Sequence, residues 1–288
     1  MVYLVLAVLS TFSVAVLLKV SELKGAPSSV VIASNYVVGA ILGWAFVLWD
    51  GRLGSNTGVS AMTLALGVGG GLLWPGTLYV LTWGIRHFGV ALVGSVARLA
   101  LVVPVLFAWF FLRELLTWQS AVGVAAAFVA LYCLSPLQRG HLQAVNRQAL
   151  WYFPLLVLAM GTVELWANLF HTFGQADENF LFLTFIFTFA MIFSWLAIWR
   201  RRQPLDKAAV WRGFVLGIPN FFATFFLLES LRSPLFADHS AVVYSVYSVA
   251  GVVLIFAAGA LVWREPVTYR SALGVLVAVG AIILLNNF

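Results

Sequence analysis

Charged residues and cysteine are both scarce in this 288-residue sequence. Charged side chains make up 9% of the chain and hydrophobic ones 63%, whereas soluble domains usually carry about 25% charged residues. This composition excludes a water-soluble globule and indicates an integral membrane protein. The single cysteine, Cys133, excludes an internal disulfide and a cysteine-based metal site. We therefore expect neither a metal ion nor a cofactor.

Acidic and histidine residues are too few and too scattered to suggest a catalytic centre. An intramembrane enzyme would need a pattern such as His-Glu-x-x-His, paired aspartates or a Ser/His couple within the membrane. The acidic residues inside the apolar runs are Glu164 and, near one end, Glu229. We predict that the chain is not an enzyme. An intramembrane enzyme, or a channel or receptor without transport coupling, stays open as the alternative.

Long apolar runs fill the chain, and most are close to the ~20 residues that a helix needs to cross a bilayer. They are too long for the strands of a membrane barrel, which have roughly 9–11 residues. The sequence therefore predicts an all-α membrane protein with ten transmembrane helices, at 2–20, 28–49, 59–83, 88–112, 117–137, 149–172, 179–199, 209–230, 239–262 and 269–287.

One stretch of the chain occurs twice, because residues 99–134 match residues 250–285 after a shift of 151 positions. The match predicts two five-helix repeats, 1–137 and 149–288, joined by a loop over 138–148. An odd number of crossings in each repeat would insert the second one upside down, as in many secondary carriers. The identical pairs include Arg113/Arg264, Glu114/Glu265, Thr117/Thr268, Ser120/Ser271, Ala121/Ala272, Gly123/Gly274 and Val124/Val275.

Basic residues gather in the connections on one side of the predicted bundle. Twelve of the sixteen Lys and Arg residues lie there, and only Arg52, Arg113 and Arg232 lie on the other side. The positive-inside rule then places both termini outside the cytoplasm, in a multi-pass protein of the cell (inner) membrane. Because the basic residues form no continuous patch, we expect the lipid bilayer and a small molecule as partners, and not nucleic acid.

The repeat, the ten runs and the paired Arg-Glu turns together resemble the EamA-type ten-helix branch of the drug/metabolite transporter superfamily. Its most specific features here are Ser95 and Pro104 before Arg113-Glu114, and the run from Gly217 to Asn220. The resemblance implies a carrier of small metabolites such as amino acids, with runs 1–4 and 6–9 around a central cavity and runs 5 and 10 outside it. We expect a monomer. The family is usually drawn with cytoplasmic termini, the reverse of the orientation predicted above.

Two ionisable residues lie well inside apolar runs, where charge is costly and usually functional. They are Arg98 and Glu164, whose predicted depths differ by only about 7 Å. Arg98 could bind an anionic group of the substrate, and Glu164 could bind a cationic group or carry a coupling proton, because burial disfavours its charged form. Alternatively, the two could form a buried ion pair that only fixes the packing of the halves.

Further polar residues share the face of Glu164 or lie beside prolines. Asn168 and His171 follow Glu164 at helical spacing and extend a polar stripe. Pro75 and Pro219 interrupt matching runs in the two halves, and such interruptions often mark a carrier's hinge and binding site, although kinks needed only for packing are an equal alternative. The remaining predicted substrate-binding residues are Trp74, Asn220, Asn35, Tyr36, Tyr244 and Tyr247. Gly39 with Gly43, and Gly67 with Gly71, predict close helix contacts.

Overall fold

All regular structure in the described part of the chain is helical, which confirms the predicted all-α class. The computed structural model describes residues 2–49, 59–111, 118–134, 143–175, 178–232 and 240–285. Its elements are α1 (Val2–Leu23), α2 (Ser28–Trp49), α3 (Ala61–Phe88), α4 (Val90–Ala97), the 3₁₀ helix η2 (Arg98–Leu101), α5 (Val102–Phe111), α6 (Trp118–Leu134), α7 (Gln143–Phe173), α8 (Asn179–Arg200), α9 (Lys207–Arg232), α10 (Ser240–Leu261) and α11 (Tyr269–Leu285).

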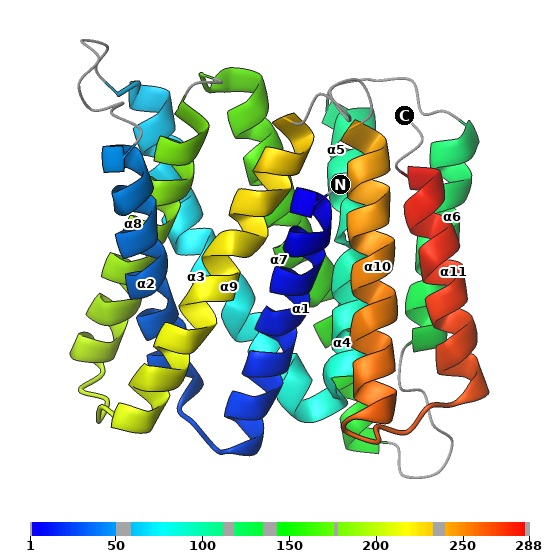
Figure 1. Ribbon diagram of the computed structural model, residues 1–288. Coiled ribbons are helices and arrows are strands. Elements are labelled where there is room, and N and C mark those ends of the chain that lie inside the picture. The colour runs from blue at the N-terminus through cyan, green and yellow to red at the C-terminus, as the bar shows by residue number, and fades with distance from the viewer. Residues whose placement is uncertain are drawn as a thin grey trace.

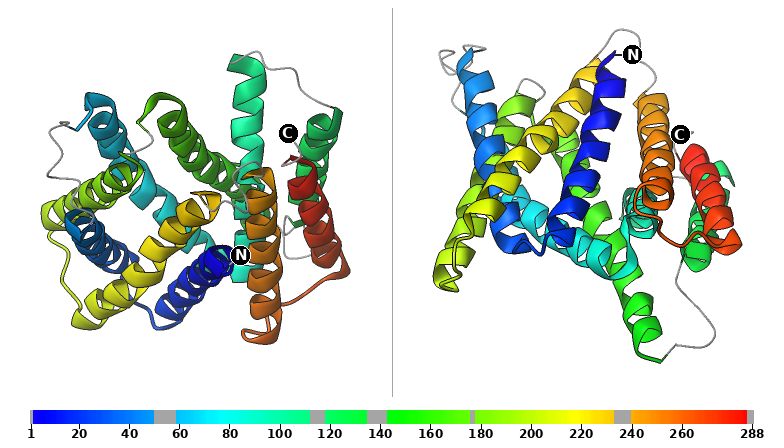
Figure 2. Two further views of the ribbon diagram at one scale, coloured as in Figure 1. Left: turned by 45° about the horizontal axis from the view of Figure 1, so that its top comes forward. Right: turned by 60° about the horizontal axis from the view of Figure 1, so that its bottom comes forward.

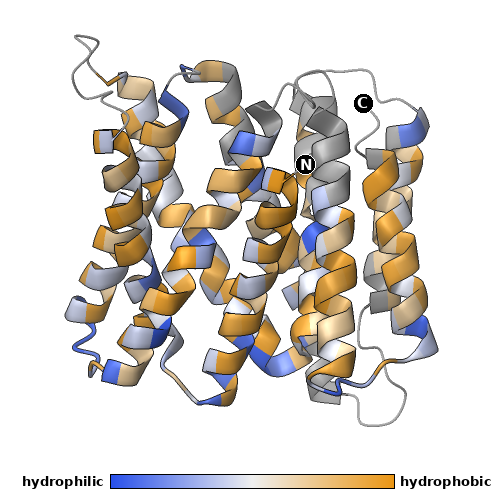
Figure 3. Cartoon of the chain, viewed as in Figure 1, coloured by the Kyte–Doolittle hydropathy of each residue, from blue (hydrophilic) through white to orange (hydrophobic). Residues whose placement is uncertain are grey.

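Six of the described helices are long and apolar enough to cross a membrane. These are α1, α2, α3 and α8, together with residues 148–166 of α7 and 207–227 of α9. Four shorter apolar helices lie at 90–100, 121–130, 247–261 and 269–284. Figure 3 shows hydrophobic residues along the middle of the bundle and hydrophilic ones mostly near the helix ends. These features fit a membrane protein, and ten crossings stay a prediction.

The helices form one bundle whose members run in alternating directions (Figure 1). α1 descends from the N-terminal end of the chain, and α11 rises to the same end of the bundle. α6 and α11 pack extensively on each other and lie side by side at one edge (Figures 1 and 2). The remaining long helices form the main body of the bundle beside this pair.

Contacts in the main body come in matched pairs. α2 packs on α9 as α8 packs on α3, and α1 packs on α9 as α7 packs on α3. In the same way, α1 packs on α10 as α7 packs on η2 and α5. The contacts α2 with α8, α4 with α10 and α6 with α11 each join one helix of the first five predicted runs to its counterpart among the second five.

Glycines allow α2 and α3 to approach α8 closely, as the sequence predicted. A Cβ atom at Gly39 would lie 2.0 Å from the ring of Phe187, and one at Gly43 would lie 2.7 Å from the Thr184 hydroxyl. On α3, a Cβ atom at Gly71 would lie 2.4 Å from the Cβ of Phe189. Small residues at these positions therefore let the helices approach closely enough for extensive van der Waals contact.

The predicted run 88–112 is not one continuous α-helix. Gly89 separates α3 from α4 with a φ of 86°, which an L side chain rarely adopts. The chain then passes from α4 through η2, which begins at Arg98, into α5. A short 3₁₀ segment inside an α-helical run often marks a functional hinge. The candidate cation thus lies at the interruption itself.

Two further predicted features can be located in the helices. Pro75 and Pro219 lie inside α3 and α9, and both helices continue through them. Their role as hinges stays a prediction. α7 begins at Gln143, inside the range 138–148 that the sequence assigned to the connecting loop. Its first turns project from the bundle at the end opposite the chain termini (Figure 2).

Candidate functional site

Arg98 lies between α4, α5 and α10, with its guanidinium over the ring of Tyr247. The Arg98 Cζ is 4.7 Å from the ring centroid, a cation–π contact. The backbone of α10 approaches Arg98 closely at Gly251, where a Cβ atom would lie 2.9 Å from a guanidinium nitrogen. The Tyr247 hydroxyl is in turn 2.5 Å from the Thr11 hydroxyl on α1. Among the described residues, Arg98 is therefore oriented by an aromatic ring and a glycine, and not by a carboxylate.

Glu164 on α7 is near Arg98 but forms no ion pair with it in the described structure. The 3₁₀ helix η2, which begins at Arg98, packs against α7. The Oε2 atom of Glu164 is buried and has no hydrogen-bond partner among the described residues. The alternative of a permanent structural pair between Arg98 and Glu164 is thus not what the structure contains. The carboxyl group retains capacity to bind a proton or a ligand.

A second polar group lies between α2 and α9. The Asn220 Nδ2 donates to the Asn35 Oδ1 at 3.0 Å. Asn35 and the neighbouring Tyr36 are fully buried, and the Asn35 Nδ2 and the Tyr36 hydroxyl have no described hydrogen-bond partners. Trp74 packs at the edge of the apolar cluster that contains Tyr36. Four of the predicted binding residues are therefore brought together here.

The predicted residues thus fall into two groups, one around Arg98 and one around Asn35. Tyr247 joins the first group, in direct contact with Arg98. The side chains of Asn168, His171 and Tyr244 lie outside the described part of the structure. Sequence reasoning missed Thr11 and Gly251, whose residue types are common in membrane helices and give no signal without their neighbours.

Glu265 and Lys19 form a partly buried network at the end of the bundle opposite the termini. Glu265 Oε1 accepts hydrogen bonds from Lys19 Nζ and from the backbone N–H of Val90, both at 2.9 Å. Its Oε2 accepts from the N–H of Ala91 at 3.0 Å. The carboxylate therefore satisfies two of the first N–H groups of α4, where the helix dipole favours a negative charge. The repeated Arg-Glu motif drew attention to Glu265, but the sequence did not predict that it would bind the first N–H groups of α4.

Glu178 plays a related part at the opposite end, before α8. Its carboxylate accepts from the backbone N–H of Ser60 at 2.9 Å and from the hydroxyls of Ser60 and Thr63. Burial raises the pKa of Glu178, but these hydrogen bonds from the Ser60 and Thr63 side chains and the Ser60 backbone lower it more, so the pKa lies below the ordinary value of 4.5. No sequence pattern had singled this residue out.

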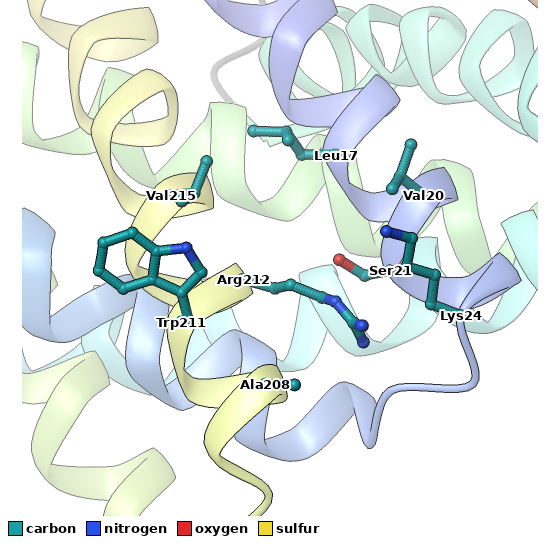
Figure 4. Close-up of a pocket in the computed structure, with 8 residues that line it drawn as sticks. All are labelled: Leu17, Val20, Ser21, Lys24, Ala208, Trp211, Arg212 and Val215. Carbon is teal, nitrogen blue, oxygen red and sulfur yellow. The ribbon is translucent and has the colours of Figure 1, made fainter.

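A pocket of about 360 Å³ lies apart from both polar groups, between α1 and α9 (Figure 4). It is at the end of the bundle where most basic residues gather. We call it the α1–α9 pocket, and it is lined by Leu17, Val20, Ser21, Lys24, Ala208, Trp211, Arg212 and Val215. Within the described residues, no cluster of three or more His, Cys, Asp or Glu side chains could hold a metal ion.

Comparison with known proteins shows similarity along the whole chain. No family model matches the sequence. A protein of Haemophilus influenzae (strain ATCC 51907 / DSM 11121 / KW20 / Rd), described as uncharacterized, is 26% identical over 286 residues, covering 97% of this chain and 95% of that protein. A crystal structure of a protein has a TM-score of 0.60 at 16% identity and covers 98% of each chain. This likeness shows a shared fold and nothing more specific.

Proposed function

We propose that the chain is a secondary carrier of small polar or zwitterionic metabolites such as amino acids, and that it works by alternating access in the cell membrane. The proposal includes ten membrane-spanning segments arranged as two inverted repeats, 1–137 and 149–288. It also retains the EamA-type resemblance on which the sequence interpretation rested. The observation that carries it is a cation at a helix interruption near Glu164, whose buried Oε2 atom has no hydrogen-bond partner among the described residues.

The matched helix contacts support the inverted repeat. A two-fold axis that exchanges the halves maps a contact between two helices onto the contact between their counterparts, and the most extensive contacts of the main body follow this pattern. The pairs α2–α9 and α3–α8, and α1–α9 and α3–α7, exchange in this way. α1 and α7, which begin the two halves, run in opposite directions through the bundle (Figure 1). That antiparallel start is what an axis in the membrane plane requires.

Arg98 is the proposed anchor for an anionic group of the substrate. Its planar fork of N–H donors suits a carboxylate, and no carboxylate of the described chain is paired with it. The cation–π contact with Tyr247 holds the guanidinium without consuming those donors. An interrupted helix is also where carriers commonly hold charged substrate groups. Arg98 therefore combines the chemistry and the position that a substrate carboxylate needs.

Glu164 and the polar group around Asn35 supply the remaining contacts to the proposed substrate. The unpartnered Glu164 Oε2 can accept from a substrate ammonium group or bind a coupling proton. The Asn35 Nδ2 and Tyr36 hydroxyl are buried donors without described partners, a costly state that a polar ligand would relieve. Proton coupling through Glu164 follows if substrate binding to Arg98 removes the positive charge that favours the ionised carboxyl group.

A ligand screen on the purified protein tests the substrate class. Amino acids, sugars, amines and nucleotides are compared by the thermal shift that each produces, because a ligand of the folded state raises stability by mass action. We expect zwitterionic or anionic metabolites to stabilise the wild type. Arg98→Ala should lose the shift, whereas Arg202→Ala, which removes an exposed cation at a helix end, should keep it. Equal shifts in all three proteins would contradict the role of Arg98.

Transport measurements test the coupling separately. The wild type and Glu164→Gln are compared in proteoliposomes with an imposed pH gradient, using a substrate found in the screen. We expect the wild type to accumulate substrate and the Gln variant to equilibrate it without accumulation. Gradient-driven accumulation that persists in Glu164→Gln would show that another group carries the proton. Failure of any substrate to cross the bilayer would instead contradict the carrier function itself.

A further inference from the structure

The α1–α9 pocket is lined by two cationic side chains and by several apolar ones. Lys24 extends from the end of α1 and Arg212 from the first turns of α9, and Figure 4 shows both charged groups in the space between these helices, near the Ser21 hydroxyl. In the described structure neither cation is paired with a carboxylate. The adjacent Asp206 is already engaged, since its oxygens accept from the N–H groups of Ala208 and Ala209 at 3.0 and 3.2 Å.

Two other cations at this end of the bundle have acidic partners. Lys19 is paired with Glu265, and Arg86 is paired with Glu22. Those two ion pairs neutralise their charges within the protein. Lys24 and Arg212 therefore leave a local positive charge at a concave site, which is the condition for binding an external anion.

The apolar residues that line the rest of the pocket indicate which kind of anion it would bind. Trp211 and Val215 line it, are 67% and 37% exposed, and continue along α9 into Ile218, which is 50% exposed. These residues follow one another at helical spacing and form an apolar track that leads from the cations toward the middle of the bundle. Leu17 and Val20 of α1 form the facing wall. A small soluble anion would make no use of this track, whereas a phospholipid acyl chain would lie along it.

We propose that the α1–α9 pocket binds an anionic phospholipid, with the headgroup phosphate between Arg212, Lys24 and the Ser21 hydroxyl and an acyl chain along Trp211, Val215 and Ile218. The volume of about 360 Å³ lies within the range of small-ligand sites, roughly 300–1,000 Å³. Basic pockets between transmembrane helices on the cytoplasmic side commonly hold lipid headgroups. The positive-inside rule gives the same side to this end of the bundle. The proposal does not depend on the carrier function.

Native mass spectrometry of the detergent-purified protein tests the headgroup. Phosphatidylglycerol and phosphatidylcholine with identical acyl chains are titrated into the wild type and into Lys24→Gln/Arg212→Gln. We expect the wild type to prefer phosphatidylglycerol and the double variant to bind it about twenty-five-fold more weakly, because each cation near the membrane surface contributes about fivefold. The matched control, Arg202→Gln/Lys207→Gln, removes two exposed cations of the same helix connection outside the pocket and should keep the preference.

Three outcomes would overturn the proposal. The first is the same affinity for phosphatidylglycerol in the pocket variant and the control. The second is equal affinity of the wild type for both lipids. The third is binding of inorganic phosphate or glycerol 3-phosphate as tightly as the lipid, which would assign the pocket to a soluble anion. Arg212→Lys keeps the charge and should retain the preference, so that a loss through misfolding is recognised by comparison with this variant.

A substitution in the apolar wall tests the binding of the acyl chain separately from that of the headgroup. Val215→Ser makes this position of the track polar and removes apolar volume, and it leaves both cations in place. We expect it to weaken phosphatidylglycerol binding several-fold and to leave any weak binding of inorganic phosphate unchanged. Unchanged lipid binding in Val215→Ser would contradict the placement of the acyl chain on α9.

Discussion

Two carboxylates hold helix ends at opposite sides of the bundle, and their donors differ in kind. Glu265 accepts from one ammonium group and two backbone N–H groups, on Lys19, Val90 and Ala91. Glu178 accepts from one backbone N–H and two hydroxyls, on Ser60 and Thr63. A backbone N–H or an ammonium group can only donate, whereas a hydroxyl can rotate and accept instead. The two sites should therefore respond very differently to the same substitution.

The comparison shows how charge is neutralised at each end. At the basic end, Glu265 has a cation within reach and forms an ion pair that links α1 to the start of α4. At the other end, the described donors to Glu178 are all neutral, so its charge is stabilised by hydrogen bonds at the start of α3, where the helix dipole is positive. The donors around Glu265 therefore require acceptor atoms at fixed positions, whereas the hydroxyls around Glu178 can adapt to a different group.

Glu265→Gln should cause the largest loss of stability. The amide nitrogen cannot accept, so either Lys19 or one of the two backbone N–H groups must face another donor in a site that is only 15% exposed. We expect a loss of about 3 kcal/mol, the range for breaking a buried charge pair. Thermal unfolding in detergent without substrate measures it. A loss no larger than that of Glu178→Gln at neutral pH would contradict the distinction between the two sites.

Gly89→Ala tests the Glu265 site by a change in the backbone segment that the carboxylate contacts. Gly89 has a φ of 86°, and a Cβ atom there would lie 2.7 Å from the Glu265 carboxyl group. Gly25 is the matched control, because its φ is 63° and a Cβ atom would meet nothing within 4 Å. Gly25→Ala should cost about 1 kcal/mol from backbone strain alone, and Gly89→Ala about twice as much. Equal melting temperatures for the two variants would show that the carboxylate moves aside freely.

These networks also show where sequence reasoning succeeded and where it could not. The apolar runs predicted where most of the helices lie, although run 88–112 is interrupted and α7 begins before residue 149. Their sparse charges drew attention to Arg98 and Glu164. The break at η2 was not predicted, because Leu99, Ala100 and Leu101 continue the apolar run after Arg98 and none of these residue types disfavours a helix. The partners of Glu265 could not be predicted, since two of them are backbone N–H groups of Val90 and Ala91, about which side-chain identity says nothing.

The amide pair between α2 and α9 illustrates the same limit. Asn35 and Asn220 were each predicted to bind substrate, but no contact between them was predicted. Their hydrogen bond depends on the glycines of α9, where a Cβ atom at Gly217 would lie 2.5 Å from the Asn35 carbonyl oxygen. Only the packed helices show that this close approach brings the two amides within 3.0 Å.

Glu178→Gln should have the smallest effect, and that effect should depend on pH. The hydroxyls of Ser60 and Thr63 can rotate to accept from the new amide group, so we expect a loss of about 1 kcal/mol at neutral pH.

Because the pKa of Glu178 is lowered on folding from its ordinary value of 4.5, ionisation of this group stabilises the fold above that pH. The stabilisation disappears as the pH falls through the lowered pKa. The difference in melting temperature between wild type and Glu178→Gln should therefore shrink as the pH falls below the ordinary value of 4.5 and through the lowered pKa. A difference that stays constant or grows with acidification would mean that the hydrogen bonds from Ser60 and Thr63 do not favour the charged form, and that Glu178 is held by packing alone.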